Sequence, residues 1–98
     1  ITAIPVSDTV KRATQERLVD RTIDRSDLWR VQTPQAFRYD LLLRAFEKAM
    51  ADSYYGTDES SLVEYIGQPV KIIMGSLLNI KITRPEDLVL GEKIALLF

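Results

Sequence analysis

NIKITRPEDL, residues 79–88, joins a strand-like run to the start of a helix. Ile80 and Ile82 alternate with polar residues, which is the period-2 pattern of a β-strand that has one buried face. Lys81 lies between the two isoleucines, so its side chain is predicted to point away from that face. The stretch therefore predicts a cation close to the end of a strand.

A helix is predicted to begin near Arg84, directly after this strand. Thr83 and Glu86 have the T-x-x-E spacing of a capping box, and Pro85 suits the first turn of a helix. Anionic ligands bind at such junctions in open α/β sheets, because free amide groups and the helix dipole favour negative charge. Two interpretations of Lys81 follow from these residues: a cation that meets an anionic ligand, or a solvated lysine at an ordinary strand exit.

The composition restricts the chemistry that the chain can perform. Its 98 residues include no Cys and no His, which excludes a thiolate nucleophile, an imidazole base, a disulfide and a Cys/His zinc site. Carboxylates, hydroxyls, lysine and arginine remain, and these suit reactions in which charged groups are positioned, such as phosphoryl or nucleotidyl transfer.

Charge and hydropathy limit the partners. A net charge of −1 argues against a nucleic-acid partner, which would require a basic face. The apolar runs are only a few residues long, far below the ~20 residues of a membrane span, so no membrane partner is predicted. We expect a cytoplasmic location in a bacterium, or the plastid stroma if the source is a plant.

Two segments near the N-terminus predict an antiparallel hairpin. Residues 4–12 and 18–25 are rich in Val, Ile and Thr, and the polar stretch ATQER between them has the length of a hairpin loop. An isolated hairpin is marginally stable in water. The hairpin, taken as residues 1–25, is therefore expected to form an arm that leans on the domain body or on a second subunit.

Residues 26–98 are predicted to form three helices and two strands. Apolar residues at helical spacing and capping residues mark the helices, whereas residues 70–74 and 78–83 have the composition of strands whose pairing stays open. These elements are too few to cover both faces of a parallel sheet, and no glycine-rich phosphate loop occurs. We expect residues 1–98 to be a single partial α/β domain, with the other half on the N-terminal side.

Four stretches together carry a resemblance to a known family, in the same order and at similar spacing: PVSDTVKR, DRSDLWRVQTPQAF, TDESSLVEYIG and NIKITRPEDL. They resemble the C-terminal part of the 2-C-methyl-D-erythritol 4-phosphate cytidylyltransferase family. The resemblance implies the C-terminal portion of a Rossmann-like nucleotidyltransferase domain with a protruding β-arm used for homodimerisation. It also implies transfer of CMP from CTP to 2-C-methyl-D-erythritol 4-phosphate in non-mevalonate isoprenoid biosynthesis, with release of pyrophosphate and with bound Mg²⁺.

The resemblance assigns roles to five residues. Thr9, Arg25 and Thr33 would reach from the arm region to the substrate in the partner subunit's site. Thr57 and Lys81 would belong to the site of their own subunit, Thr57 near the methylerythritol phosphate and Lys81 near the phosphates where charge builds up. Arg25 and Lys81 are the candidate catalytic residues, and all five are candidate substrate-binding residues.

The resemblance also places essential groups outside this chain. The glycine-rich nucleotide loop, the cytosine-reading residues and the Asp that binds Mg²⁺ belong to the N-terminal half of the family's enzymes. The 98 residues alone are therefore expected to be inactive and to require that half as a partner.

Structural interpretations compete with these roles. Arg25 lies between Asp24 and Asp27, where it would form a surface ion pair of little energetic value. Thr57 would cap the following helix, and the other two threonines would be ordinary strand or turn residues. Two functional alternatives also stay open: a cytidylyltransferase for another alditol phosphate such as ribitol 5-phosphate, and a dimerisation module without catalysis.

Overall fold

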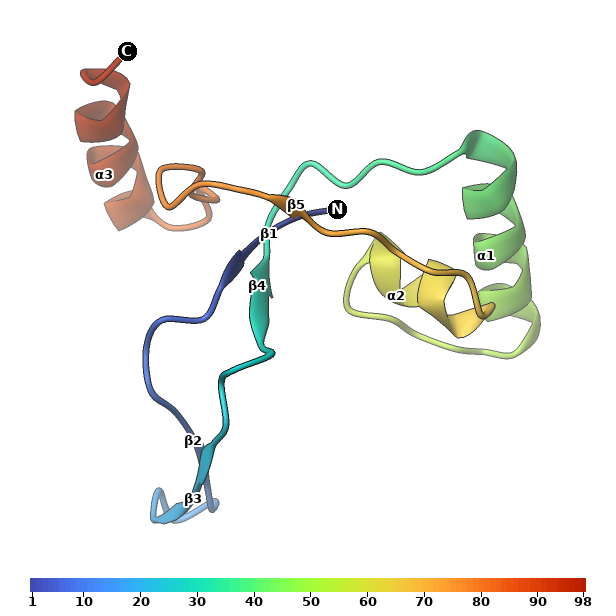
Figure 1. Cartoon of the computed structure of the whole chain (residues 1–98), viewed down its shortest axis with the longest axis horizontal. Helices are drawn as coiled ribbons and strands as arrows, with labels where there is room; N and C mark the ends of the chain where they lie inside the picture. Colours follow the sequence, from blue (N-terminus) through green and yellow to red (C-terminus); the bar gives the residue numbers. More distant parts are fainter.

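The computed structural model describes residues 1–98 as a mixed α/β arrangement (Figure 1). Its strands form two separate sheets, and its helices lie outside them. In chain order the elements are β1 Thr2–Pro5, β2 Val10–Ala13, β3 Val19–Ile23, β4 Trp29–Val31, α1 Tyr39–Ala51, α2 Glu59–Tyr65, β5 Ile73–Met74 and α3 Pro85–Ala95.

The predicted hairpin forms from β2 and β3, which pair antiparallel. Its loop is closed by the amide of Thr14, which donates to the carbonyl of Leu18 at 2.8 Å. Arg17 in this loop has a φ of 66°, the left-handed conformation that a tight turn uses. All residues of the two strands are exposed except Ile23, which is half-buried. The hairpin projects away from the helices as an arm (Figure 1).

The structure corrects the N-terminal boundary of the arm. We predicted that residues 1–25 form the hairpin, but β1 pairs antiparallel with β4 and parallel with β5, in a second sheet of order β4-β1-β5. The physical reason is burial, because Ala3 and Ile4 are the only buried residues of any strand. The apolar N-terminal end of the predicted strand 4–12 belongs to β1 in the three-stranded sheet, and its charged C-terminal end forms β2 in the arm.

The helices α1 and α2 enclose the main apolar cluster, formed by Ala45, Ala49, Leu62 and Val63. Helical spacing in the sequence predicts an apolar stripe of Leu42, Ala45, Phe46, Ala49 and Met50. Ala45 and Ala49 of this stripe are buried against α2 and Leu42 packs on them, whereas Met50 is 79% exposed.

The C-terminal ends of the two helices are joined by a hydrogen bond, in which the Tyr65 hydroxyl donates to the Asp52 carboxylate at 2.6 Å. This bond, with a further one from Lys48, lowers the pKa of Asp52. The two helices thus form one locally packed unit.

The second predicted strand, residues 78–83, does not form. Within the predicted strand 70–74, only Ile73–Met74 joins the sheet, and residues 75–84 contain no strand. The amide of Asn79 instead donates to the carbonyl of Ser76 at 3.1 Å, which makes a turn. No strand of residues 1–98 pairs with this segment, and a ladder requires a partner.

The described chain does not close around a core of its own. Only 7 of its 98 residues are buried, and α3 contains none of them. The radius of gyration is 16.8 Å, whereas a compact chain of this length has about 13 Å. Large apolar side chains are exposed on β5 and α3. None of the three helices has the length and apolar character required to cross a bilayer.

Candidate functional site

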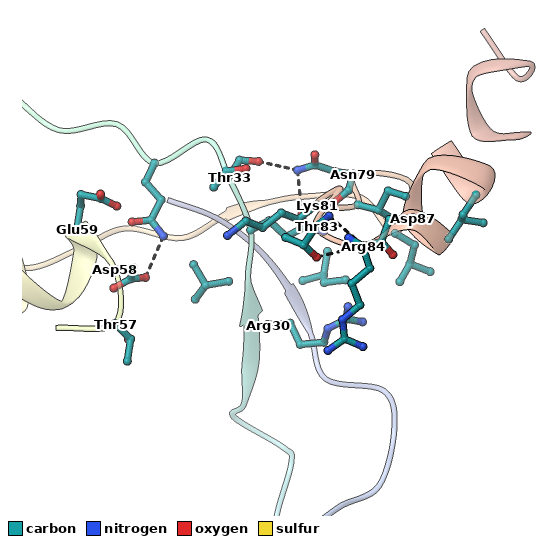
Figure 2. Close-up of a pocket in the computed structure, with 17 residues that line it drawn as sticks. Arg30, Thr33, Thr57, Asp58, Glu59, Asn79, Lys81, Thr83, Arg84 and Asp87 are labelled. Atoms are coloured by element: carbon teal, nitrogen blue, oxygen red, sulfur yellow. Dashed lines mark hydrogen bonds between the residues drawn. The ribbon is translucent and has the colours of Figure 1, made fainter. Parts of the chain in front are cut away.

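One open cavity of about 820 Å³ brings together three of the five candidate residues. Thr33 follows β4, Thr57 precedes α2, and Lys81 lies in the segment before α3. Figure 2 shows Thr57 on one side of the cavity and Lys81 on the other. The lining is mostly polar and includes five further charged side chains: Arg30, Asp58, Glu59, Arg84 and Asp87.

Two amide side chains fix the Lys81 segment to the end of β4. The Gln32 side-chain nitrogen donates to the carbonyls of Ser76, at 2.8 Å, and Asn79, at 3.2 Å. The Asn79 side-chain nitrogen donates in return to the carbonyl of Thr33, at 2.7 Å. We call this set the Gln32–Asn79 clamp. Because the segment has no strand partner, the clamp is what holds Lys81 beside Thr33.

Substitution of Gln32 by alanine is expected to loosen this segment. The change removes three hydrogen bonds of about 0.5–1.5 kcal/mol each, so the Asn79 amide should exchange with solvent at least about tenfold faster. Hydrogen exchange followed by NMR measures this rate. Gln68→Ala is the matched control, because Gln68 is exposed and its side chain makes no hydrogen bond. Equal exchange in the two variants would contradict the clamp.

The opposite wall of the cavity is the start of α2. We considered Thr57 as the helix cap, but Asp58 is the capping residue: its carboxylate accepts from the Ser61 amide at 2.8 Å. Gln35 connects this cap to the chain after β4, because its side-chain nitrogen donates to Asp58 at 2.9 Å and its oxygen accepts from the Ser60 amide at 3.2 Å. The Thr57 hydroxyl makes no bond to the helix and is exposed on the cavity.

The helix start beyond Lys81 is capped differently from our prediction. The predicted box joined Thr83 to Glu86, whereas the Asp87 carboxylate accepts from the amides of Thr83, at 3.0 Å, and Arg84, at 2.9 Å, and from the Thr83 hydroxyl, at 3.1 Å. These bonds hold the pKa of Asp87 below its ordinary value. The amides of Thr83 and Arg84, which directly precede α3, are thus already paired and are not free to bind an anion.

This cap predicts a pH-dependent structure at the start of α3. Because folding lowers the pKa of Asp87 below its ordinary value of 3.8, the cap contributes fully above that pH and is lost as the pH falls through the lower, folded value. The amide NMR signals of Thr83 and Arg84 should therefore titrate with a midpoint below 3.8. Asp87→Asn should abolish this titration. The control variant Glu86→Gln should preserve this titration. If the titration is lost in Glu86→Gln, the Thr83–Glu86 capping box predicted from the sequence is correct.

Lys81 itself has an uncompensated charge. Its side chain is exposed on the cavity, and the one ion pair in residues 1–98 joins Lys48 to Asp52 at 3.2 Å, on α1 and its end. No carboxylate therefore neutralises the Lys81 ammonium. This arrangement makes the group available to an anion that enters the cavity.

The two remaining candidates, Thr9 and Arg25, lie in the arm and line no part of the cavity. Arg25 donates to the carbonyl of Ser7 at 2.7 Å, across the base of the arm. The ion-pair interpretation of Arg25 is wrong, because Asp24 instead accepts from the Ser26 amide and hydroxyl, and no pair with Asp27 forms. The structure thus separates Thr33 from the two arm residues with which the resemblance grouped it.

The carboxylates of the cavity do not form a magnesium site. Asp58 and Asp87 already accept amide donors, which leaves Glu59 as the one uncommitted carboxylate. No group of three or more potential Asp, Glu, His or Cys ligands occurs within residues 1–98. Mg²⁺ is a hard cation that requires several oxygen ligands, and this set does not fit it.

Four residues of the site were missed in the sequence: Gln32, Asn79, Arg30 and Arg84. Gln32 and Asn79 lie inside the stretches that carry the resemblance, Gln32 directly before Thr33 and Asn79 two residues before Lys81. That proximity was the available signal for the clamp. In the sequence, Arg30 has the pattern of an ordinary exposed strand residue, and Arg84 that of a residue before a helix. Nothing local indicated that these two arginines would share a cavity.

The chain is similar to known proteins over nearly its whole length. Residues 1–96 match the family model described as 2-C-methyl-D-erythritol 4-phosphate cytidylyltransferase. The enzyme of that name from Geobacillus kaustophilus is 56% identical over 94 residues, which are 96% of this chain and 41% of the relative. The one from Pelotomaculum thermopropionicum is 53% identical over 92 residues, 94% of this chain and 39% of the relative.

A solved structure agrees with these sequences. The crystal structure of 2-C-methyl-D-erythritol 4-phosphate cytidylyltransferase from Thermus thermophilus superposes with a TM-score of 0.85 at 36% identity, and the match covers 96% of this chain and 46% of that one. Our chain therefore spans less than half the length of the relatives that it matches. The family model, the relatives and the shared fold together assign the chain to the 2-C-methyl-D-erythritol 4-phosphate cytidylyltransferase family.

Proposed function

We propose that residues 1–98 form one wall of the active site of a cytidylyltransferase that acts on 2-C-methyl-D-erythritol 4-phosphate. The observation that carries this proposal is the cavity in which Thr33, Thr57 and the uncompensated Lys81 ammonium meet. In the reaction, a phosphate oxygen of the polyol phosphate attacks the α-phosphorus of CTP. The bond from that phosphorus to the bridging oxygen of the β-phosphate breaks, and pyrophosphate leaves with the electron pair.

Lys81 serves this reaction as an electrostatic group. Negative charge increases on the oxygens around the α-phosphorus as the new bond forms, and a positioned cation stabilises it most in the transition state. Thr57 and Thr33 contribute hydroxyl groups that bind and orient the polyol phosphate. The Gln32–Asn79 clamp keeps Thr33 and Lys81 at a fixed separation.

The arm serves a second subunit in this proposal. Its two strands are exposed, and a free hairpin is marginally stable, so a partner surface would supply the packing that this chain lacks. Thr9 and Arg25 then contact the substrate in the partner subunit's site. The complete protein is thus a homodimer of Rossmann-like nucleotidyltransferase domains.

The remainder of the enzyme supplies what these residues lack. We assign CTP recognition and the Mg²⁺ ligands to the N-terminal half, because the carboxylates of this cavity do not fit Mg²⁺. When bound, Mg²⁺ neutralises phosphate charge and orients the triphosphate. The exposed apolar side chains of β5 and α3 are the surface on which that half packs. A cytoplasmic location suits an enzyme with these soluble substrates.

A chimera tests the proposal. The 94-residue segment of the Geobacillus kaustophilus relative that matches this chain is replaced by residues 1–98, and pyrophosphate release is measured with CTP and the polyol phosphate. We expect turnover within about tenfold of the unaltered relative, and none from the isolated 98-residue chain. Turnover by the isolated chain would show that no other half is required. A folded, CTP-binding chimera without turnover would overturn the proposal and favour a dimerisation module.

The same assay determines which alditol phosphate is the acceptor substrate. The relatives that we compared carry the methylerythritol description, so no observation favours ribitol 5-phosphate. We expect kcat/KM for 2-C-methyl-D-erythritol 4-phosphate to exceed that for ribitol 5-phosphate by at least about 100-fold, because unpaired polar groups in a site penalise the wrong ligand. The reverse ratio would assign the chain to the other alditol phosphate.

A further inference from the structure

Gln35 joins the two walls of the cavity that carry Thr33 and Thr57. It lies two residues after Thr33, in the segment between β4 and α1, and it lines the cavity. Its side-chain nitrogen donates to the Asp58 carboxylate at 2.9 Å, and its side-chain oxygen accepts from the Ser60 amide at 3.2 Å. We call these two bonds the Gln35 bridge. Figure 2 shows Asp58 beside Thr57, on the side of the cavity away from Thr33.

The Gln35 bridge is the hydrogen-bonded connection between these two walls. Within residues 1–98, no other hydrogen bond joins the segment 32–38 to the segment 56–61. The Gln32–Asn79 clamp holds Thr33 on the other side, beside the segment that carries Lys81. The hydrogen bonds that relate Thr33 to the start of α2 are therefore those of the bridge alone.

Thr57 is fixed to the start of α2 independently of Gln35. Asp58 caps that helix, because its carboxylate accepts from the Ser61 amide at 2.8 Å and its carbonyl accepts from the Ser61 hydroxyl at 2.6 Å. Gly56, on the other side of Thr57, lies so close to the Ser61 hydroxyl that a β-carbon on it would collide with that group. Thr57 therefore moves as one body with the start of α2, and a shift of the helix start relative to β4 displaces the Thr57 hydroxyl in the cavity.

The two oxygens of the Asp58 carboxylate have separate partners. Oδ1 accepts from the Ser61 amide, within the cap, whereas Oδ2 accepts from Nε2 of Gln35. A substitution can thus break the bridge without loss of the cap. The apolar cluster of α1 and α2, on which Phe37 packs, includes neither Gln35 nor Asp58. We therefore expect the helix pair to stay folded when the bridge is broken.

We propose that Gln35 is a positioning residue: it sets the location of Thr57 relative to Thr33 and thereby the affinity of the cavity for the acceptor polyol phosphate. This inference rests on the proposed function for the identity of that substrate. Both polar atoms of the Gln35 side chain are already bonded to the protein, so Gln35 acts through Thr57 and not by contact with the substrate. Groups that bind one ligand must be held within roughly 0.5 Å of their productive positions, and a hydrogen bond to a carboxylate is among the strong ones that can hold them.

An exchange of chemical groups between Gln35 and Asp58 isolates the bridge. In Gln35→Glu, a carboxylate oxygen replaces the donor and faces Asp58, and two carboxylates at this distance repel each other. In Asp58→Asn, the new amide nitrogen faces that of Gln35, and turning either amide over would break the bond to Ser61 or to Ser60. The double variant Gln35→Glu/Asp58→Asn restores both bonds, because the new amide donates to the new carboxylate, which still accepts from Ser60. The double variant also keeps the total charge of the pair.

The first test measures geometry without catalysis. Crystal structures of the chimera and its variants give the position of Thr57 relative to Thr33. We expect Gln35→Glu to displace Thr57 by about 1 Å or more, a distance sufficient to impair a binding site, and we expect the double variant to return it. If Thr57 keeps its place when the bridge is broken, the proposal is wrong.

The second test separates the acceptor from the nucleotide. In the chimera, Gln35→Glu and Asp58→Asn should each raise KM for the polyol phosphate about tenfold and leave KM for CTP within about twofold, and the double variant should restore KM for the polyol phosphate to within about twofold. The control Gln68→Glu makes the same chemical change at an exposed residue whose side chain has no hydrogen bond, so both constants should stay within about twofold.

Two kinetic results would overturn the positioning role: a double variant as impaired as the single ones, or an equal rise of KM for both substrates, which indicates a general loss of structure. An unaltered chimera without turnover would instead refute the proposed function. The crystal structures would then decide whether Gln35 positions Thr57.

Discussion

Replacement of Lys81 by alanine in the chimera is expected to lower kcat about 100- to 1,000-fold and to leave the KM for CTP within about threefold. The reason is the cavity geometry. The ammonium is exposed on the lining, no carboxylate neutralises it, and the clamp fixes the segment that carries it. The attraction between this ammonium and the α-phosphate is strongest when negative charge develops there in the transition state. Removal of the ammonium therefore lowers kcat. Steady-state kinetics with both substrates varied measure the two constants.

The matched control for this experiment is Lys71→Ala. Lys71 is exposed, lies outside the cavity, and has the same charge, so its removal tests the general effect of a lost cation. We expect that variant to retain wild-type kcat within about twofold. If Lys81→Ala behaves in the same way, Lys81 is a solvated lysine at the end of an extended segment, which was the second interpretation of its sequence.

Arg25→Ala is expected to lower kcat/KM in the chimera about 100-fold, the cost of losing a charged contact to a substrate phosphate. The distinctive result comes from mixing that variant with Lys81→Ala. If Arg25 acts in the partner's site, each mixed dimer contains one intact site. Random exchange at equal concentrations makes half of the dimers mixed, so about one quarter of the wild-type activity should return.

Two measurements separate this role from a structural one. Arg25 also donates to the carbonyl of Ser7 at the base of the arm. If the substitution acts only through the loss of this bond, it destabilises the dimer and the mixed dimers recover no activity. Size-exclusion chromatography of Arg25→Ala should therefore show an unchanged dimer. Arg21→Ala, an exposed arginine of β3, should keep full activity. No recovery of activity in the mixed dimers would place Arg25 in its own subunit or outside the reaction.

The local patterns of this sequence predicted the local structure well. The hairpin formed because its strands and polar loop are neighbours in the chain, and the apolar stripe of Ala45 and Ala49 packed as its spacing indicated. The prediction of the residue that caps α3 was wrong by one position. Glu86 satisfies the motif spacing, but the shorter Asp87 side chain reaches back to the amides of Thr83 and Arg84.

Features that depend on distant partners were not predictable from one sequence. The stretch around Lys81 has the alternation of a strand, yet no other strand of residues 1–98 pairs with it. The apolar end of the predicted arm joined β4 and β5 instead, and its pairing with β5 links Thr2 to Ile73, far apart in the chain. Thr33, Thr57 and Lys81 were identified through the family resemblance, whereas nothing in the sequence placed Arg30 and Arg84 on the same cavity.

The sheet order β4-β1-β5 has a consequence for how the site assembles during synthesis. The hairpin and the α1–α2 unit consist of near neighbours in the chain and can form while translation continues, whereas β1 must wait for β5. The segment that carries Lys81 follows β5 and reaches the clamp only after it has left the ribosome. The cavity that contains Thr33, Thr57 and Lys81 therefore cannot form before residues 73–84 have emerged from the ribosome.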